Sequence, residues 1–144
     1  MSRGGYLHSE VLLRPIEQLL RSAGATVRSE CAVRKGRDTG YVDLYASWTN
    51  RSVVIEVELT PVRVRNDVAK AGELSPDLLV IVTPTASVAR AVRRRLGMRG
   101  PSCRRRQLEI WVYPFGAAIE RLAAWCRLDS HDTESEPSAM RKGL

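Results

Sequence analysis

The residues best suited to chemistry are two carboxylates inside a strand-like run. Glu56 and Glu58 lie two residues apart in the segment from Ser52 to Leu59, whose other residues are mostly apolar and β-branched. A strand of this composition is expected to be buried, and side chains two residues apart on a strand point to the same face. The preceding run, from Tyr41 to Ser47, carries Asp43. A four-residue segment separates the two runs, which therefore predict a β-hairpin.

Folding this hairpin about Asn50 and Arg51 brings Asp43 opposite Val57 or Glu58 and within diagonal reach of Glu56. Three carboxylates in one partly buried patch oppose one another's ionisation. A divalent cation would relieve this repulsion, because carboxylate oxygens are preferred ligands of Mg²⁺, Ca²⁺ and Mn²⁺. A structural network of salt bridges would relieve it as well, and its candidate cations are Arg34, Arg63 and Lys70. From the residues alone, both interpretations stay open.

The helix predicted after Pro61, from Val62 to Ala71, carries one polar stripe. Arg63, Asn66, Asp67 and Lys70 recur at the three- and four-residue spacing that places them on one helix face. That face can meet the sheet edge where the strand carrying Glu56 ends. Because a lysine stem is long and apolar, Lys70 is expected to deliver its ammonium group to the carboxylates.

The remaining elements define an α/β fold. Amphipathic periodicity predicts a helix over residues 7–23, and alternation predicts a strand over 25–33 before a turn cluster. An apolar strand over 78–83, a helix over 86–96, a strand over 107–113 and a helix over 117–126 follow. An antiparallel meander followed by crossover helices implies a mixed central sheet with helices on both faces. Residues 1–128 are expected to form one domain, and the polar composition of 129–144 predicts a disordered tail.

The acidic strings and their order resemble those of the PD-(D/E)XK nuclease superfamily, which includes restriction endonucleases and Holliday-junction resolvases. The strings are Tyr41-Val-Asp43-Leu, then Val54-Ile-Glu56-Val-Glu58-Leu-Thr60, then Lys70 on the next helix. The resemblance implies a restriction-endonuclease-like sheet with an α-β-β-β-α-β core, extended here by a further α-β-α unit.

The resemblance also implies roles for individual residues. Asp43 and Glu56 look like the two metal-binding acids, with Glu58 as a further ligand of Mg²⁺ or Mn²⁺. The family usually has a lysine where this chain has Glu58, and Lys70 is the candidate for a catalytic lysine supplied by the following helix. Glu10 is similar in placement to a first-helix glutamate that archaeal junction resolvases add to the site.

Charge indicates a polyanionic partner. The net charge is +7, and because the last sixteen residues hold four acids and two basic residues, residues 1–128 carry +9. A body this basic attracts nucleic acid, although the predominance of arginine (20 of 23 basic residues) also fits a genome of high GC content. The candidate phosphate contacts are His8, Arg63, Arg93, Arg94 and Arg95.

We therefore expect a metal-dependent phosphodiesterase, an endonuclease acting on DNA, with RNA as a further possible substrate. An alternative is a catalytically inactive nuclease fold that serves as a DNA-binding or assembly subunit, and a lesser one is a basic interaction domain whose acids form salt bridges. The family resemblance implies a homodimer, since two sites cut both strands. No membrane span, secretory signal or small-molecule cofactor is expected, which predicts a cytoplasmic protein.

Overall fold

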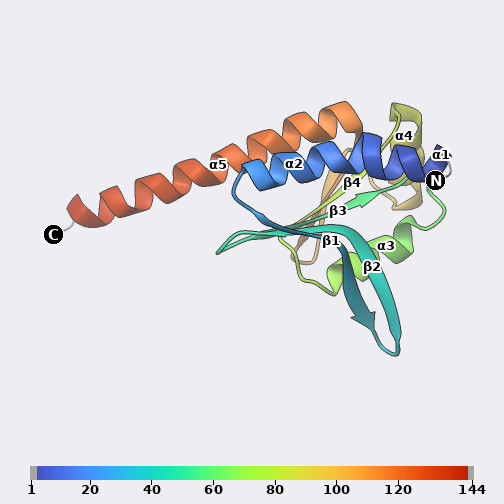
Figure 1. Cartoon of the computed structure of the whole chain (residues 1–144), viewed down its shortest axis with the longest axis horizontal. Helices are drawn as coiled ribbons and strands as arrows, with labels where there is room; N and C mark the ends of the chain where they lie inside the picture. The colour runs from blue at the N-terminus through green and yellow to red at the C-terminus, as the bar shows by residue number, and fades with distance from the viewer. Residues whose placement is uncertain (1–2, 143–144) are drawn as a thin grey trace.

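A six-stranded mixed sheet forms the centre of the structure, a computed structural model (Figure 1). It describes the backbone of residues 3–142 and the side chains of residues 4–34 and 36–128. The strand order is β1-β2-β3-β4-β6-β5. The strands are β1 (Thr26–Lys35), β2 (Asp38–Ser47), β3 (Ser52–Val57), β4 (Leu78–Thr83), β5 (Ser102–Arg105) and β6 (Leu108–Pro114). The predicted α/β class with a mixed sheet is confirmed.

The sheet changes from antiparallel to parallel at its middle. β1, β2 and β3 form the expected antiparallel meander, whereas β4 runs parallel to β3 and β6 runs parallel to β4. Parallel neighbours require crossover connections. Helix α3 (Val64–Gly72) connects β3 to β4, and helix α4 (Ala86–Arg95) lies on the way from β4 to the last two strands.

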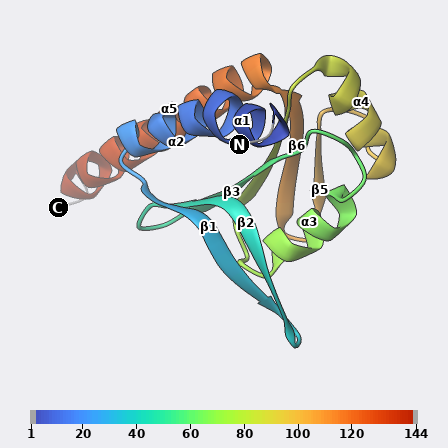
Figure 2. The same cartoon turned by 45° about the vertical axis from the view of Figure 1, so that its right-hand side comes forward.

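Helices cover both faces of the sheet (Figure 2). One face packs against the N-terminal helices and α5 (Phe115–Lys142), through core residues such as Ile16, Ile55 and Leu122. The other face packs against α3 and α4, through Val64, Leu79 and Val92 among others. Because β3 and β4 are covered on both faces, their sequences read as continuous apolar runs.

The N-terminal helical segment changes geometry along its length. A short α1 (Arg3–Tyr6) leads into a π-helical segment, η1 (Leu7–Leu13), and then into α2 (Arg14–Ser22). The helix predicted over residues 7–23 is thus present, but its first two turns are π-helical. Pro15 has no N–H to donate, and its ring would meet the Val11 carbonyl in a continuous α-helix, so the change of geometry falls beside a residue that an uninterrupted α-helix disfavours.

The turn between β2 and β3 lies one residue earlier than expected. Ser47 pairs with Ser52 and Leu44 with Ile55, and the Trp48 N–H donates to the Arg51 carbonyl at 2.8 Å. The two residues at the tip are therefore Thr49 and Asn50. This register corrects the predicted pairing of Asp43 with Val57 or Glu58.

The β1–β2 hairpin is longer than predicted. Its ladder continues to the pair Lys35 and Asp38, where the sequence had indicated a turn cluster, and it closes at Gly36 with φ +63°. Residues 31–42 project beyond β3 as an arm (Figures 1 and 2). At the base of this arm, Glu30 has φ +49° and the pairing between Ser29–Leu44 and Cys31–Val42 is interrupted opposite Asp43.

The C-terminal part of the chain contains one strand that the sequence does not indicate. The sequence indicates a single strand at residues 107–113, but β5 precedes it as an edge strand, joined through Arg106 with φ +57°. β5 escapes detection because it is short and largely exposed. The backbone of α5 is helical to Lys142, and because the side chains of 129–144 lie outside the described residues, the disordered tail predicted from residue 129 stays a prediction. In the described part of the chain, no helix combines the length and apolarity that crossing a membrane requires.

Candidate metal centre

Three carboxylates converge where β3 ends and α3 begins. Glu56 is the penultimate residue of β3, Glu58 follows the strand, and Asp67 lies in the first turn of α3. One carboxylate oxygen of each lies within 4.8 Å of those of the other two. The Glu58 N–H donates to the Val82 carbonyl at 2.9 Å, so the backbone of this loop stays attached to β4.

The two glutamates are buried with part of their hydrogen-bonding capacity unused. Glu56 and Glu58 are only 3 % and 6 % exposed. The Oε1 atom of each has no hydrogen-bond partner among the side chains and backbone that the structure describes. Leaving buried carboxylate oxygens without partners is costly. The donor set therefore fits a divalent cation, because three clustered carboxylates can supply oxygens that the protein itself leaves unsatisfied.

Burial also makes these carboxylates hard to ionise without a cation. Burial raises the pKa of Glu56 from 4.5 to about 9, and the charge of Asp43 adds to the effect. Burial raises the pKa of Glu58 from 4.5 to about 10, with a further contribution from Asp67. A bound dication would reverse both effects, because it favours the charged form of every ligand.

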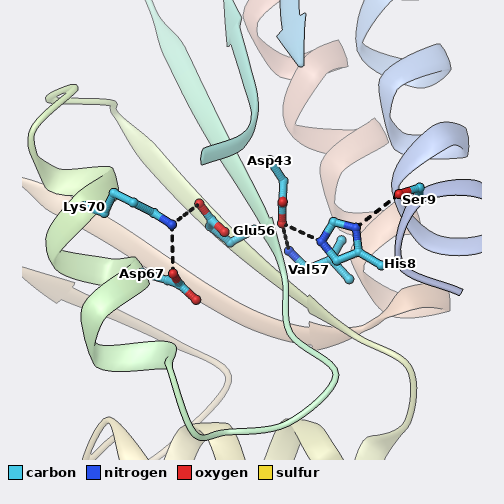
Figure 3. A network of polar contacts seen from close by, with 7 residues as sticks. All are labelled: His8, Ser9, Asp43, Glu56, Val57, Asp67 and Lys70. Atoms are coloured by element: carbon cyan, nitrogen blue, oxygen red, sulfur yellow. Dashed lines mark hydrogen bonds and ion pairs between the residues drawn. The ribbon is translucent and has the colours of Figure 1, made fainter. Parts of the chain in front are cut away.

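Asp43 lies beside Glu56 but outside the trio. Its Oδ2 accepts a hydrogen bond from the Val57 N–H at 2.8 Å and lies 3.1 Å from His8 Nε2 (Figure 3). The trio that comes closest together is therefore Glu56, Glu58 and Asp67, whereas the sequence grouped Asp43 with the two glutamates. The sequence placed Asp67 on the same polar stripe as Lys70, which was the available signal, but did not assign it to the metal.

Lys70 reaches the carboxylates as its spacing predicted. Its Nζ lies 2.9 Å from Asp67 Oδ1 and 3.9 Å from Glu56 Oε1 (Figure 3). Burial lowers the pKa of Lys70, but the hydrogen bond to Asp67 and the charge of Glu56 outweigh it, so that the pKa is raised overall. Lys70 is thus a permanent cation at this site. Among the described residues, neither Arg34 nor Arg63 forms an ion pair with the trio.

A glycine makes room for the Lys70 stem. A Cβ atom on Gly40 of β2 would lie 2.8 Å from Lys70 Cδ and 3.4 Å from its Cγ. Contacts this short force one of the two groups to move. Gly40 therefore allows the lysine to cross β2 on its way from α3 to Glu56.

The N-terminal helices contribute to the other side of the centre. His8, on η1, approaches Asp43, and this hydrogen bond raises the pKa of the imidazole. A cavity of about 390 Å³ lies between η1, α2 and β1, and its lining includes His8, Glu10, Glu30 and Asp43. Glu10 shares this cavity with Asp43, but its carboxylate pairs with Arg14 at 2.9 Å and does not join the trio.

The arginines predicted to contact phosphate occupy different environments. Arg63 is exposed at the start of α3, and Arg94 and Arg95 are exposed on α4. Arg93 is partly buried, because its Nε and Nη2 donate to the Val112 carbonyl at 3.1 and 2.7 Å. The guanidinium of Arg93 therefore holds α4 to β6, which corrects its grouping with the exposed pair.

Comparison with protein-family models, with curated proteins and with solved structures finds no match to this chain.

Without metal, the protein is expected to lose stability as the pH rises. The folded-state pKa values of Glu56 and Glu58 are raised from 4.5 to about 9 and 10, so between these values the native state binds more protons than the unfolded state. The stability that the two protonated glutamates contribute is fully present below their pKa in the unfolded chain. It is lost as the pH rises through their pKa in the folded protein. Urea denaturation in EDTA should show the free energy of unfolding falling by about 1.4 kcal/mol per pH unit for each of the two glutamates.

The isosteric pair Glu56→Gln and Glu58→Gln provides the control, because neutral amides do not titrate. The doubly substituted protein should lose most of this slope. Mn²⁺ should restore stability to the native protein at the alkaline end, since binding to the folded state stabilises it, but not to the variant. A native profile that is flat with pH and unchanged by Mn²⁺ would rule out the metal centre.

Gly40→Ala should destabilise the protein by about 1–3 kcal/mol, the usual range for overpacking, because its Cβ displaces Lys70. The test is a double-mutant cycle by chemical denaturation. In a Lys70→Ala background the obstructing methylenes are absent, so the same substitution should cost almost nothing. Equal costs in the two backgrounds would show that Gly40 serves the strand and not the lysine.

Proposed function

We propose that this chain is a divalent-metal-dependent nuclease that hydrolyses phosphodiester bonds of DNA, cutting within the strand. The observation that carries the proposal is the trio of Glu56, Glu58 and Asp67, whose glutamates are buried with unsatisfied oxygens beside a fixed lysine cation. The order of elements supports a restriction-endonuclease-like fold. A helix precedes a three-stranded antiparallel meander, and a helix and a parallel fourth strand follow.

Oxygen-only ligands favour hard cations, so Mg²⁺ or Mn²⁺ is the proposed cofactor. Glu56, Glu58 and Asp67 would hold it, and Asp43 approaches from the side of β2. When bound, the ion would polarise the scissile phosphate and lower the pKa of a coordinated water. A protein nucleophile is not needed for hydrolysis of this kind.

The chain's own residues supply orientation and charge. The Val57 N–H and His8 hold the Asp43 carboxylate in place at 2.8 and 3.1 Å. Lys70, a fixed cation, stabilises negative charge that develops on the phosphoryl oxygens in the transition state. His8 and Arg63 are proposed to approach the phosphates that flank the cut.

DNA is proposed as the substrate because the net charge of residues 1–128 is +9, and a body this basic attracts a polyanion. RNA presents the same phosphates and is the comparison substrate for every assay. A homodimer is proposed, because two copies of one site would let a small protein cut both strands.

A second candidate function is a nuclease fold that binds DNA without cutting it. Two features favour it: the Lys70 ammonium is already hydrogen-bonded to Asp67 at 2.9 Å, and Glu58 stands where the nucleases that the sequence resembles usually have lysine. The third interpretation, in which the acids only form salt bridges, is disfavoured by the unpartnered oxygens of Glu56 and Glu58.

Plasmid DNA should be nicked and linearised with Mg²⁺ or Mn²⁺ and left intact in EDTA. Glu56→Gln is the matched control, because it keeps the shape of a carboxyl that is protonated in the metal-free protein. We expect this variant to fold and to bind DNA but to lose cleavage by at least about a hundredfold. DNA binding in EDTA combined with no cleavage under either metal would favour the inactive, DNA-binding alternative.

Lys70→Ala should reduce cleavage by about 10²- to 10³-fold while leaving Mn²⁺ binding and DNA affinity close to native values. Single-turnover cleavage and calorimetric titration with Mn²⁺ measure the two effects separately. Lys70→Arg should restore little activity, since the guanidinium is planar and its charge diffuse. Full activity of Lys70→Ala would exclude this role and direct attention to Arg63.

A further inference from the structure

Three adjoining cavities form an arginine-lined surface that runs from α3 past the C-terminal end of α4. Their volumes are about 470, 420 and 410 Å³. The first two share Val68, Ala69 and Arg105, and the last two share Arg94, so each cavity adjoins the next. We call this surface the arginine band and define it by the exposed residues Arg65, Arg90, Arg94, Arg95, Arg99 and Arg106.

The band has almost no compensating negative charge. Residues 78–108 contain eight arginines and no aspartate or glutamate. No carboxylate lines the cavity of 420 Å³ or that of 410 Å³. Glu73 and Asp77 line only the outer cavity of 470 Å³, and the Asp77 carboxylate there accepts a hydrogen bond from the Ser52 N–H at 2.8 Å.

Two guanidinium groups are held in place, Arg65 within the band and Arg105 beside it. Arg65 Nε donates to the Arg95 carbonyl at 3.1 Å, and Arg105 Nη2 donates to the Leu96 carbonyl. Both bonds satisfy carbonyl groups at the end of α4, where cations are favoured by the helix dipole. These bonds fix two guanidinium groups in position before a ligand binds, which reduces the conformational entropy that the side chains lose on binding.

The other arginines of the band are not used by the fold. Within the part of the chain whose side chains are described, no hydrogen bond or ion pair is made by the side chains of Arg90, Arg94, Arg95, Arg99 or Arg106. Like charges gathered on one face without partners repel one another. A polyanion removes this repulsion, and a chain of phosphates fits a track of three cavities better than a single small anion does.

The band is separate from the candidate metal centre. Helix α3 divides the two, because Val68 and Ala69 line the band whereas Asp67 and Lys70 point to Glu56. None of the four carboxylates of the centre lines any of the three cavities. A phosphate at the metal centre and a phosphate in the band are therefore held by opposite sides of one helix.

We propose that the arginine band is a second nucleic-acid-binding surface, which holds the phosphate backbone of a DNA segment other than the one placed at the metal centre. The proposal rests on the proposed function only in its choice of DNA as the polyanion. It implies that the substrate contacts the protein on both sides of α3, so that affinity and cleavage are supplied by different surfaces.

The test compares two charge-matched double variants. Arg94→Gln with Arg106→Gln removes two charges from the band, whereas Arg28→Gln with Arg121→Gln removes two exposed charges from β1 and α5. Binding of a short fluorescein-labelled DNA duplex is measured by anisotropy in EDTA over a series of salt concentrations. Circular dichroism melts check that all proteins fold.

The band variant should bind roughly tenfold more weakly, and its salt slope should fall by about 2, since each lost phosphate contact removes about 0.9. The control should stay within about twofold of native affinity. If both variants lose DNA affinity equally, binding depends on net charge and not on the band. If the native protein does not bind DNA even at low salt, the polyanion is not DNA. Either result overturns the proposal. If the native protein cleaves DNA but the band variant binds DNA as tightly as the native protein, the second binding surface is refuted and the nuclease proposal stands. If the band variant binds more weakly but the native protein does not cleave DNA, only the nuclease proposal is refuted.

Discussion

Two glutamates are buried at the carboxyl end of β3, and much of the surrounding structure compensates for them. A carboxylate that leaves water without a full set of partners is unfavourable by several kcal/mol. The protein supplies one cation, Lys70, which reaches Glu56 Oε1 only at 3.9 Å. Gly40 keeps the path of this lysine open, and Asp43 is occupied by the Val57 N–H and His8. One carboxylate oxygen of each glutamate still has no hydrogen-bond partner. Such an arrangement favours the binding of a ligand over the stability of the fold.

Local periodicity explains which parts of this centre could be predicted from the sequence. Two-residue alternation identified Glu56 and Glu58 as neighbours on a buried strand, and helical spacing placed Lys70 on the face of α3 that meets them. Both inferences depend on residues close in the chain. The hairpin was also correct in kind, but its turn was placed one residue too late, because four polar or aromatic residues in succession offered no glycine to mark the tip.

Features that depend on how distant elements meet were not accessible in the same way. Asp67 joins the glutamates because the loop after β3 sets the position of α3, and no local pattern encodes that position. His8 reaches Asp43 because the π-helical turns of η1 direct it there across 35 residues of sequence. Arg93 looked like a surface residue in the sequence, but the approach of α4 to β6 gives its guanidinium a carbonyl to bind.

The position of His8 also bears on how the protein should be handled in the laboratory. Helix α1 starts at Arg3, only five residues before an imidazole that touches the carboxylate cluster, whereas α5 carries the opposite end away from it (Figure 1). A polyhistidine purification tag fused ahead of residue 1 adds metal ligands to the end of the chain from which His8 reaches Asp43, and these would compete for the metal ion. Helix α5 leads the chain away from the carboxylates as far as Lys142, which makes the C-terminal side the better one for a purification tag.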